Sequence, residues 1–216
     1  MPCQAVLFDL DGTLLDTLED LAVSMNAVLA RHGLPQHDLA SYQYHVGDGV
    51  ENLVRRTLPA DRRTSAFIAP CVAEMRAEYS RRWKDKTRPY PGIPELLDAL
   101  VARSVRLAVL SNKPDEMTRL TVSTLLPRWR FDAVRGERAG IPRKPDPAAA
   151  LDIAAELGLP AGAFLYLGDT NTDMQTAVAA GMFAVGALWG FRPAEELRAS
   201  GAQALLAQPL ELLKFL

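Results

Sequence analysis

The sequence has few cysteines and no long hydrophobic run. It contains Cys3 and Cys71 but no Cys-x-x-Cys motif, which excludes a disulfide framework and argues against a zinc site. No stretch approaches the roughly 18 apolar residues of a membrane helix. The N-terminal apolar run AVLF is too short for a signal peptide, because it ends at Asp9. We therefore expect a cytoplasmic protein.

The sequence also lacks a strong excess of either charge. It has 24 basic and 26 acidic side chains, a formal net charge of −2 and a pI of about 5.9. This balance argues against nucleic acid or an anionic membrane as the main partner. A small anionic substrate is still allowed, since its site needs positive charge only locally. The length of 216 residues suits one large domain or a domain with an insertion. We expect the protein to be a monomer or a homodimer.

Short apolar runs alternate with helical patterns over most of the chain. Such runs are typical of parallel strands covered on both faces, and they are AVLFD (5–9), VRLAVLSN (105–112), AFLYLGD (163–169) and MFAVGAL (182–188). We predict an α/β fold with a doubly wound parallel sheet. The C-terminal ALLAQPLELLKFL predicts a short edge strand and a closing helix. Residues 16–88 show only helical patterns, which predicts an all-helical domain inserted into a core of residues 1–15 and 89–216.

Polar side chains follow three of the predicted strands. They are Asp9 and Asp11 after the first, Ser111 and Asn112 at the end of the second, and Asp169 and Asp173 after the third. Because ligands of open parallel sheets bind beyond the carboxyl ends of the strands, we expect these groups to meet. Carboxylates with an open site favour Mg²⁺. Lys144, in RKPDP ahead of a Pro-led helix, would supply the positive charge that a phosphate needs. Taken singly, the acids could be a polar strand end and Lys144 a solvated surface residue.

Four of these segments together resemble a known family. DLDGTLLDT, LSNK, the KPDP lysine and GDTNTD are similar to the four motifs of the haloacid dehalogenase superfamily, in its phosphatase branch. The resemblance covers nearly the whole chain. HVGDGVENLVRRTL, LSNKP, RKPDPAAAL and LWGFRPAEELRASGA most resemble the phosphoglycolate phosphatase group. The resemblance implies a Rossmann-like core with a helical cap and a Mg²⁺-dependent phosphoric monoester hydrolase. Its substrate would be a small phosphorylated metabolite, with 2-phosphoglycolate as the leading candidate.

The resemblance also implies roles for the first two acids. Asp9 would be the nucleophile that forms an aspartyl-phosphate. Asp11 would be the general acid and then the general base, and its backbone carbonyl would touch the metal. Dehalogenases need no such acid for a halide leaving group, so Asp11 favours phosphoryl transfer from oxygen.

The other motif residues would bind the metal and the phosphoryl group. Asp169 would hold Mg²⁺ together with Asp9, and Asp173 would support the metal's water shell or orient Lys144. Ser111, helped by Asn112, would bind a phosphoryl oxygen, and Lys144 would stabilise its charge. The fourth motif has Thr170 where serine is common, a change that keeps a small hydroxyl.

Several features are open to two interpretations. Gly47 and Asp48 in HVGDGV would either contact the substrate or form a helix N-terminus, whereas we expect His45 to be structural. Trp189 and Phe191 are interpreted as packing residues at a strand end. Two alternative functions share the core motifs: a phosphomutase of sugar phosphates and a non-catalytic binding module. The intact acids and lysine argue against the second.

Overall fold

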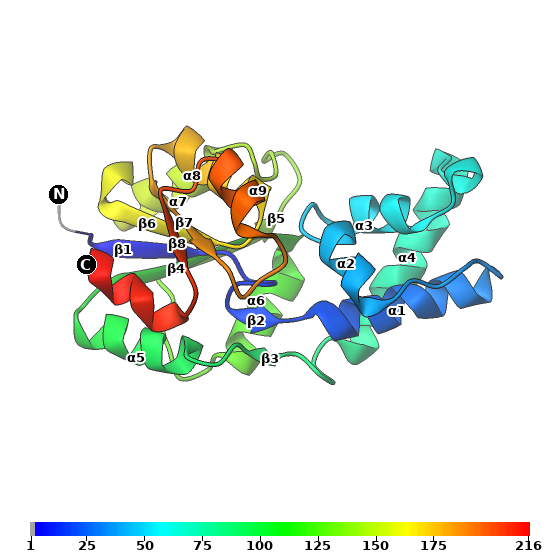
Figure 1. Cartoon of the computed structure of the whole chain (residues 1–216), viewed down its shortest axis with the longest axis horizontal. Coiled ribbons are helices and arrows are strands. Elements are labelled where there is room, and N and C mark those ends of the chain that lie inside the picture. The colour runs from blue at the N-terminus through cyan, green and yellow to red at the C-terminus, as the bar shows by residue number, and fades with distance from the viewer. Residues whose placement is uncertain (1–2) are drawn as a thin grey trace. The chain divides into compact units, whose positions relative to one another are not determined.

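The computed structural model describes residues 3–216, which form two compact units (Figure 1). The sheet unit comprises the chain up to Leu15 and Pro89–Leu216, and the helical unit is Asp16–Arg88. The chain passes between them through two short paired strands, β2 (Leu15–Asp16) and β3 (Arg88–Pro89).

A six-stranded parallel sheet forms the centre of the sheet unit. Its spatial order is β5-β4-β1-β6-β7-β8, and the strands are β1 (Ala5–Phe8), β4 (Arg106–Pro114), β5 (Ala133–Glu137), β6 (Phe164–Gly168), β7 (Phe183–Ala187) and β8 (Ala204–Leu206). All neighbouring strands run parallel. The sequence patterns did not predict β5, because an edge strand containing Arg135, Gly136 and Glu137 lacks a continuous apolar run.

Helices cover both faces of this sheet, as the predicted doubly wound fold requires. They are α5 (Ile93–Ala102), α6 (Asp115–Leu125), α7 (Ala148–Leu157), η2 (Ala161–Ala163), α8 (Asn171–Ala180), α9 (Ala194–Ala199) and η3 (Pro209–Phe215). Alternate residues of β1 point to opposite faces. Val6 and Phe8 pack in one buried cluster with α5, α6 and η3. Ala5 and Leu7 pack in the other with α7, α8 and α9. β1 is therefore buried on both faces, and the α/β fold is confirmed.

The helical unit contains α1 (Leu18–Arg31), α2 (Leu39–His45), α3 (Val50–Thr57), the short η1 (Ala60–Arg62) and α4 (Ser65–Arg82). The buried carboxylate of Glu78 on α4 pairs with Arg31, Arg81 and Arg82, so its charge is compensated. Within residues 3–216, no helix combines the length and apolar character needed to cross a membrane.

Candidate active site

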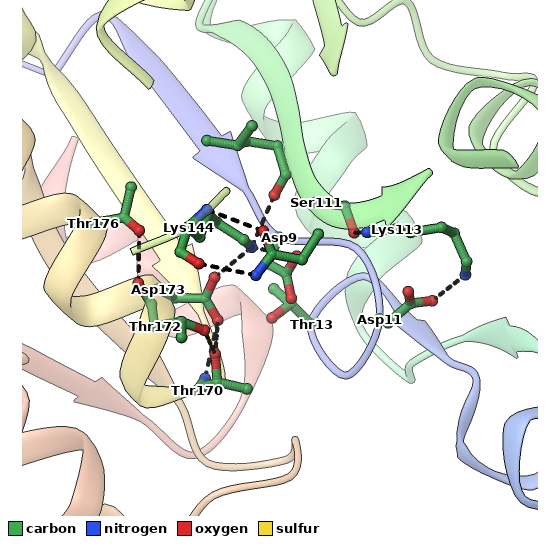
Figure 2. Close-up of polar contacts among 12 residues, drawn as sticks. Asp9, Asp11, Thr13, Ser111, Lys113, Lys144, Thr170, Thr172, Asp173 and Thr176 are labelled. Atoms are coloured by element: carbon green, nitrogen blue, oxygen red, sulfur yellow. Dashed lines mark hydrogen bonds and ion pairs between the residues drawn. The ribbon is translucent and has the colours of Figure 1, made fainter. Parts of the chain in front are cut away.

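The predicted polar groups of the sheet unit lie at the carboxyl edge of three neighbouring strands. Asp9 directly follows β1, Ser111 lies near the end of β4, and Asp169 directly follows β6. Because β1 lies between β4 and β6, residues more than 150 positions apart in sequence come together here. Figure 2 shows polar contacts of Asp9, Ser111 and the side chains around them.

The Lys144 ammonium forms the centre of this cluster. Its Nζ donates hydrogen bonds to Asp9 Oδ1 at 2.8 Å, to Asp173 Oδ1 at 2.6 Å and to the Leu110 carbonyl at 3.1 Å. The lysine is buried. It is therefore not the solvated surface residue that the sequence alone allowed. The Asn112 amide binds the Lys144 backbone in both directions, at 3.0 and 3.2 Å. Asn112 thus positions Lys144, and its contact with a phosphoryl oxygen stays a prediction.

Asp173 connects the lysine to the start of α8. Its Oδ2 accepts hydrogen bonds from the Thr170 backbone N–H at 3.0 Å and from Thr170 Oγ1 at 2.6 Å, in a capping-box arrangement. The other oxygen binds Lys144. One carboxylate therefore fixes both the helix terminus and the ammonium, and Thr170 supplies the hydroxyl at the position where serine is common.

Asp169 is held by two donors from separate loops. Thr13 Oγ1 donates to Oδ1 at 2.8 Å, and the Phe191 backbone N–H donates to Oδ2 at 2.8 Å. Trp189 Nε1 donates to the Thr13 carbonyl at 2.9 Å. Gly12 has φ +92°, and a Cβ there would lie 2.3 Å from Asp169 Oδ2, so only glycine fits.

The segment LWGF after β7 therefore orients the Asp169 carboxylate. From the sequence, Trp189 and Phe191 were expected only to pack at a strand end. The sequence signal for the additional role was the position of LWGF directly after a strand of the same sheet. A backbone N–H donor carries no residue-type signature, so its partner could not be read from the sequence.

The buried charges of the cluster do not balance. Ligand oxygens of Asp9, Asp169 and Asp173 all lie within 4.8 Å of one another, and Lys144 is the cation that contacts two of these carboxylates. Burial, reinforced by the charge of Asp173, raises the pKa of Asp9 well above its usual value. The same two causes raise the pKa of Asp169 to about 7. Burial opposes the charge of Lys144, but Asp173 and Asp9 outweigh it and raise the Lys144 pKa.

This donor set fits a divalent cation. If all three carboxylates are ionised, one ammonium leaves two negative charges uncompensated in a buried site, which is energetically unfavourable. A dication would neutralise them, and carboxylate oxygens are the ligands of hard cations such as Mg²⁺. The buried group Asp9, Asp169 and Asp173 could therefore hold a metal ion.

Asp11 lies to one side of this cluster, next to Lys113 (Figure 2). Lys113 Nζ contacts Asp11 Oδ1 at 2.5 Å, and the Lys113 backbone N–H donates to Ser111 Oγ at 3.2 Å. The Ser111 hydroxyl still has its own proton to donate to a ligand. No role was predicted for Lys113 from the sequence, although it stands in the LSNK motif beside Ser111 and Asn112.

Gly47 and Asp48 belong to the helical unit, in the loop between α2 and α3. Gly47 and Gly49 have φ values of +109° and +85°. The Asp48 carboxylate pairs with Arg56, and its carbonyl accepts a hydrogen bond from Asn52 at 3.0 Å. The loop is thus tied to α3, and its contact with a substrate stays a prediction.

Comparisons with known proteins identify the family of the chain. Residues 6–187 match the model of the haloacid dehalogenase-like hydrolase family. The chain is 30% identical to the phosphoglycolate phosphatase of Aquifex aeolicus over 99% of this chain and 96% of that protein. It is 32% identical to the phosphoglycolate phosphatase of Nitrosospira multiformis, over 100% of this chain and 96% of that protein. A crystal structure from Lactobacillus delbrueckii subsp. bulgaricus is similar with a TM-score of 0.92 and 30% identity, covering 98% of this chain and 97% of that one.

Proposed function

The chain belongs to the haloacid dehalogenase-like hydrolases, and we propose that it hydrolyses a small phosphate monoester through an aspartyl-phosphate on Asp9, with Mg²⁺. It is a phosphatase similar to the phosphoglycolate phosphatases. The observation that carries the proposal is the buried cluster in which Lys144 binds Asp9 and Asp173 beside Asp169. A binding module has no need of a nucleophile beside a charge-stabilising lysine.

In the first step, a carboxylate oxygen of Asp9 attacks phosphorus, and the bond between phosphorus and the leaving oxygen breaks. Asp11 gives its proton to that oxygen, so the product leaves as an alcohol. The Lys144 ammonium, fixed by Asp173, lies 2.8 Å from the nucleophilic carboxylate and stabilises negative charge there. The Ser111 hydroxyl donates to a phosphoryl oxygen.

In the second step, water attacks the phosphorus of the aspartyl-phosphate. Asp11, now a carboxylate, takes a proton from this water. The bond between phosphorus and Asp9 breaks, which restores the Asp9 carboxylate and releases inorganic phosphate. One acid therefore serves both half-reactions and ends in its starting state after the proton is returned.

Asp9 and Asp169 would hold the metal, with the Asp11 carbonyl as a further ligand and Asp173 supporting its water shell. When bound, Mg²⁺ neutralises phosphate charge and so reduces repulsion between the substrate and the nucleophile. The hydrogen bonds from Thr13 and the Phe191 backbone orient the Asp169 carboxylate for this task.

For the substrate, we propose 2-phosphoglycolate. The support is the similarity to phosphoglycolate phosphatases over nearly the full length of both chains. We propose that the helical unit acts as a cap that selects the leaving group, with Gly47 and Asp48 as contact residues. A cap would also restrict water access during phosphoryl transfer.

The test is a panel of phosphorylated metabolites assayed for free phosphate with Mg²⁺ and with EDTA. We expect Mg²⁺-dependent phosphate release with the highest kcat/KM for 2-phosphoglycolate. Equal turnover of unrelated monoesters would reject this substrate but leave the phosphatase assignment. Formation of a sugar phosphate isomer in place of free phosphate would show a phosphomutase, and full activity in EDTA would reject the metal requirement.

A further inference from the structure

We propose that Lys113 is a positioning residue for Asp11, holding its carboxyl group where it exchanges a proton with the leaving oxygen. This inference rests on the proposed function, in which Asp11 is the general acid. It adds a role for Lys113 of the LSNK motif, whose ammonium lies next to the Asp11 carboxyl group in Figure 2.

The contact between Lys113 and Asp11 is close and largely shielded from water. Nζ lies 2.5 Å from Asp11 Oδ1, and the two side chains are 5% and 18% exposed. The residues are 102 positions apart and come from different strand ends. Within the described part of the chain, the other oxygen of Asp11, Oδ2, has no hydrogen-bond partner. One oxygen is therefore held while the other is available for proton transfer.

The backbone of Lys113 is fixed as firmly as its ammonium. Thr118 Oγ1 donates to the Lys113 carbonyl at 3.1 Å, and the Lys113 N–H donates to Ser111 Oγ. The pairing of β4 with β5 shifts register between Leu110 and Pro114, so the chain bulges at this point. A Cβ at Gly136 of β5 would lie 2.4 Å from the Lys113 carbonyl oxygen, so β5 approaches this bulge closely. The lysine is built into the site and is not a mobile surface cation.

A fixed lysine matters because Asp11 stands in the turn that follows β1. A carboxyl group there has several staggered rotamers, and proton transfer succeeds only from the one that reaches the leaving oxygen. The hydrogen bond that the Lys113 ammonium donates to Oδ1 selects one rotamer before the substrate binds. It can form whether or not Oδ2 carries the proton. Misplacement of a catalytic group by about 1 Å can cost on the order of 100-fold in rate, so this selection contributes directly to turnover.

The dependence on the leaving group separates this role from direct phosphate binding. An alkoxide is a poor leaving group and needs protonation, whereas 2,4-dinitrophenolate leaves without it. If Lys113 acts through Asp11, its loss should affect kcat/KM for alkyl phosphates and spare 2,4-dinitrophenyl phosphate. If Lys113 instead binds the phosphoryl group, both classes should fall equally, because they share that group.

The experiment compares wild type with Lys113→Met and Lys113→Arg, using 2-phosphoglycolate, other alkyl phosphates and 2,4-dinitrophenyl phosphate. The quantity measured is kcat/KM, which reports the first half-reaction. Lys214→Met is the matched control, because it removes the same side chain from an exposed ion pair with Glu211. A cycle with Asp11→Asn then shows whether the lysine acts through the acid. Thermal unfolding of each variant verifies the fold.

We expect Lys113→Met to lower kcat/KM by about 10-fold or more for alkyl phosphates and by less than about 3-fold for the dinitrophenyl ester. The loss on alkyl phosphates would be a part of the roughly 10²–10⁴-fold acceleration that general acid catalysis supplies. Lys113→Arg should recover part of the loss. In the Asp11→Asn background, Lys113→Met should have no further effect. An equal loss on all substrates, additive losses in the double variant, or activity like that of Lys214→Met would overturn the inference. An inactive wild type would instead overturn the proposed phosphatase, and this inference with it.

Discussion

Without metal, the buried Asp169 should make the protein less stable as the pH rises. Its pKa is raised from 3.8 to about 7, by burial first and by the charge of Asp173 second. The folded protein therefore keeps a proton that the unfolded chain has released. The stabilisation is fully present below the unfolded pKa and is lost as the pH rises through the folded pKa, a sign that is the reverse of the usual carboxylate case.

The size of the effect follows from the two pKa values. For one group titrating near 4 when unfolded and near 7 when folded, the free energy of unfolding falls by on the order of 2–3 kcal/mol between about pH 5 and pH 8. In a chain of 216 residues, this lowers Tm by about 6 °C. Asp169 is fully buried, so solvent does not screen the charge.

The assay is thermal unfolding in EDTA across this pH range for wild type, Asp169→Asn and a control, Asp152→Asn, on the exposed face of α7. Wild type and Asp152→Asn should lose about 6 °C more than Asp169→Asn, whose amide does not titrate. Added Mg²⁺ binds ionised carboxylates, so it should raise Tm more at high pH than at low pH, and least in Asp169→Asn. The same pH dependence in all three proteins, or an equal Mg²⁺ effect at both pH values, would refute this reasoning.

The remaining predictions concern activity. Asp9→Asn should abolish turnover and binding of the phosphoryl mimic BeF₃⁻ while Tm stays measurable; activity near that of wild type would reject the nucleophile. Lys144→Ala should lower kcat on the order of 10²–10³-fold, since it removes a preorganised charge. Lys144→Arg should not fully restore kcat, because a planar guanidinium group does not replace a compact ammonium group. A loss of only a few-fold in Lys144→Ala would contradict this role. Substitutions at Gly47 or Asp48 should alter the ranking of phosphorylated metabolites in kcat/KM more than hydrolysis of a small generic phosphate; equal changes for both would exclude substrate selection by this loop.

Much of the fold was readable from local patterns. The runs around Val6, Val109 and Leu167 are apolar throughout, because strands covered on both faces have no solvent side. The polar groups at their ends could be expected at one edge, because parallel strands end on the same side. The edge strand β5 escaped prediction because only one of its edges pairs, so Arg135 and Glu137 are tolerated within it.

Some site residues could likewise be predicted from the sequence and others could not. Residue type and position identified Asp9, Asp11, Lys144 and Asp169, and the family resemblance assigns roles to them. Neither source indicated the Phe191 N–H, because every residue except proline carries that donor.

The sequence by itself therefore determined the α/β class, the family and the carboxylates at the strand ends, since each depends on residue type and local order. Only the tertiary structure decided which side chains act on one another. It paired Lys144 with Asp9 and Asp173, and Lys113 with Asp11, across gaps of 29 to 135 residues. The physical reason is that ion pairs and hydrogen bonds depend on distances of about 3 Å, and such distances arise only after separate strands have packed side by side.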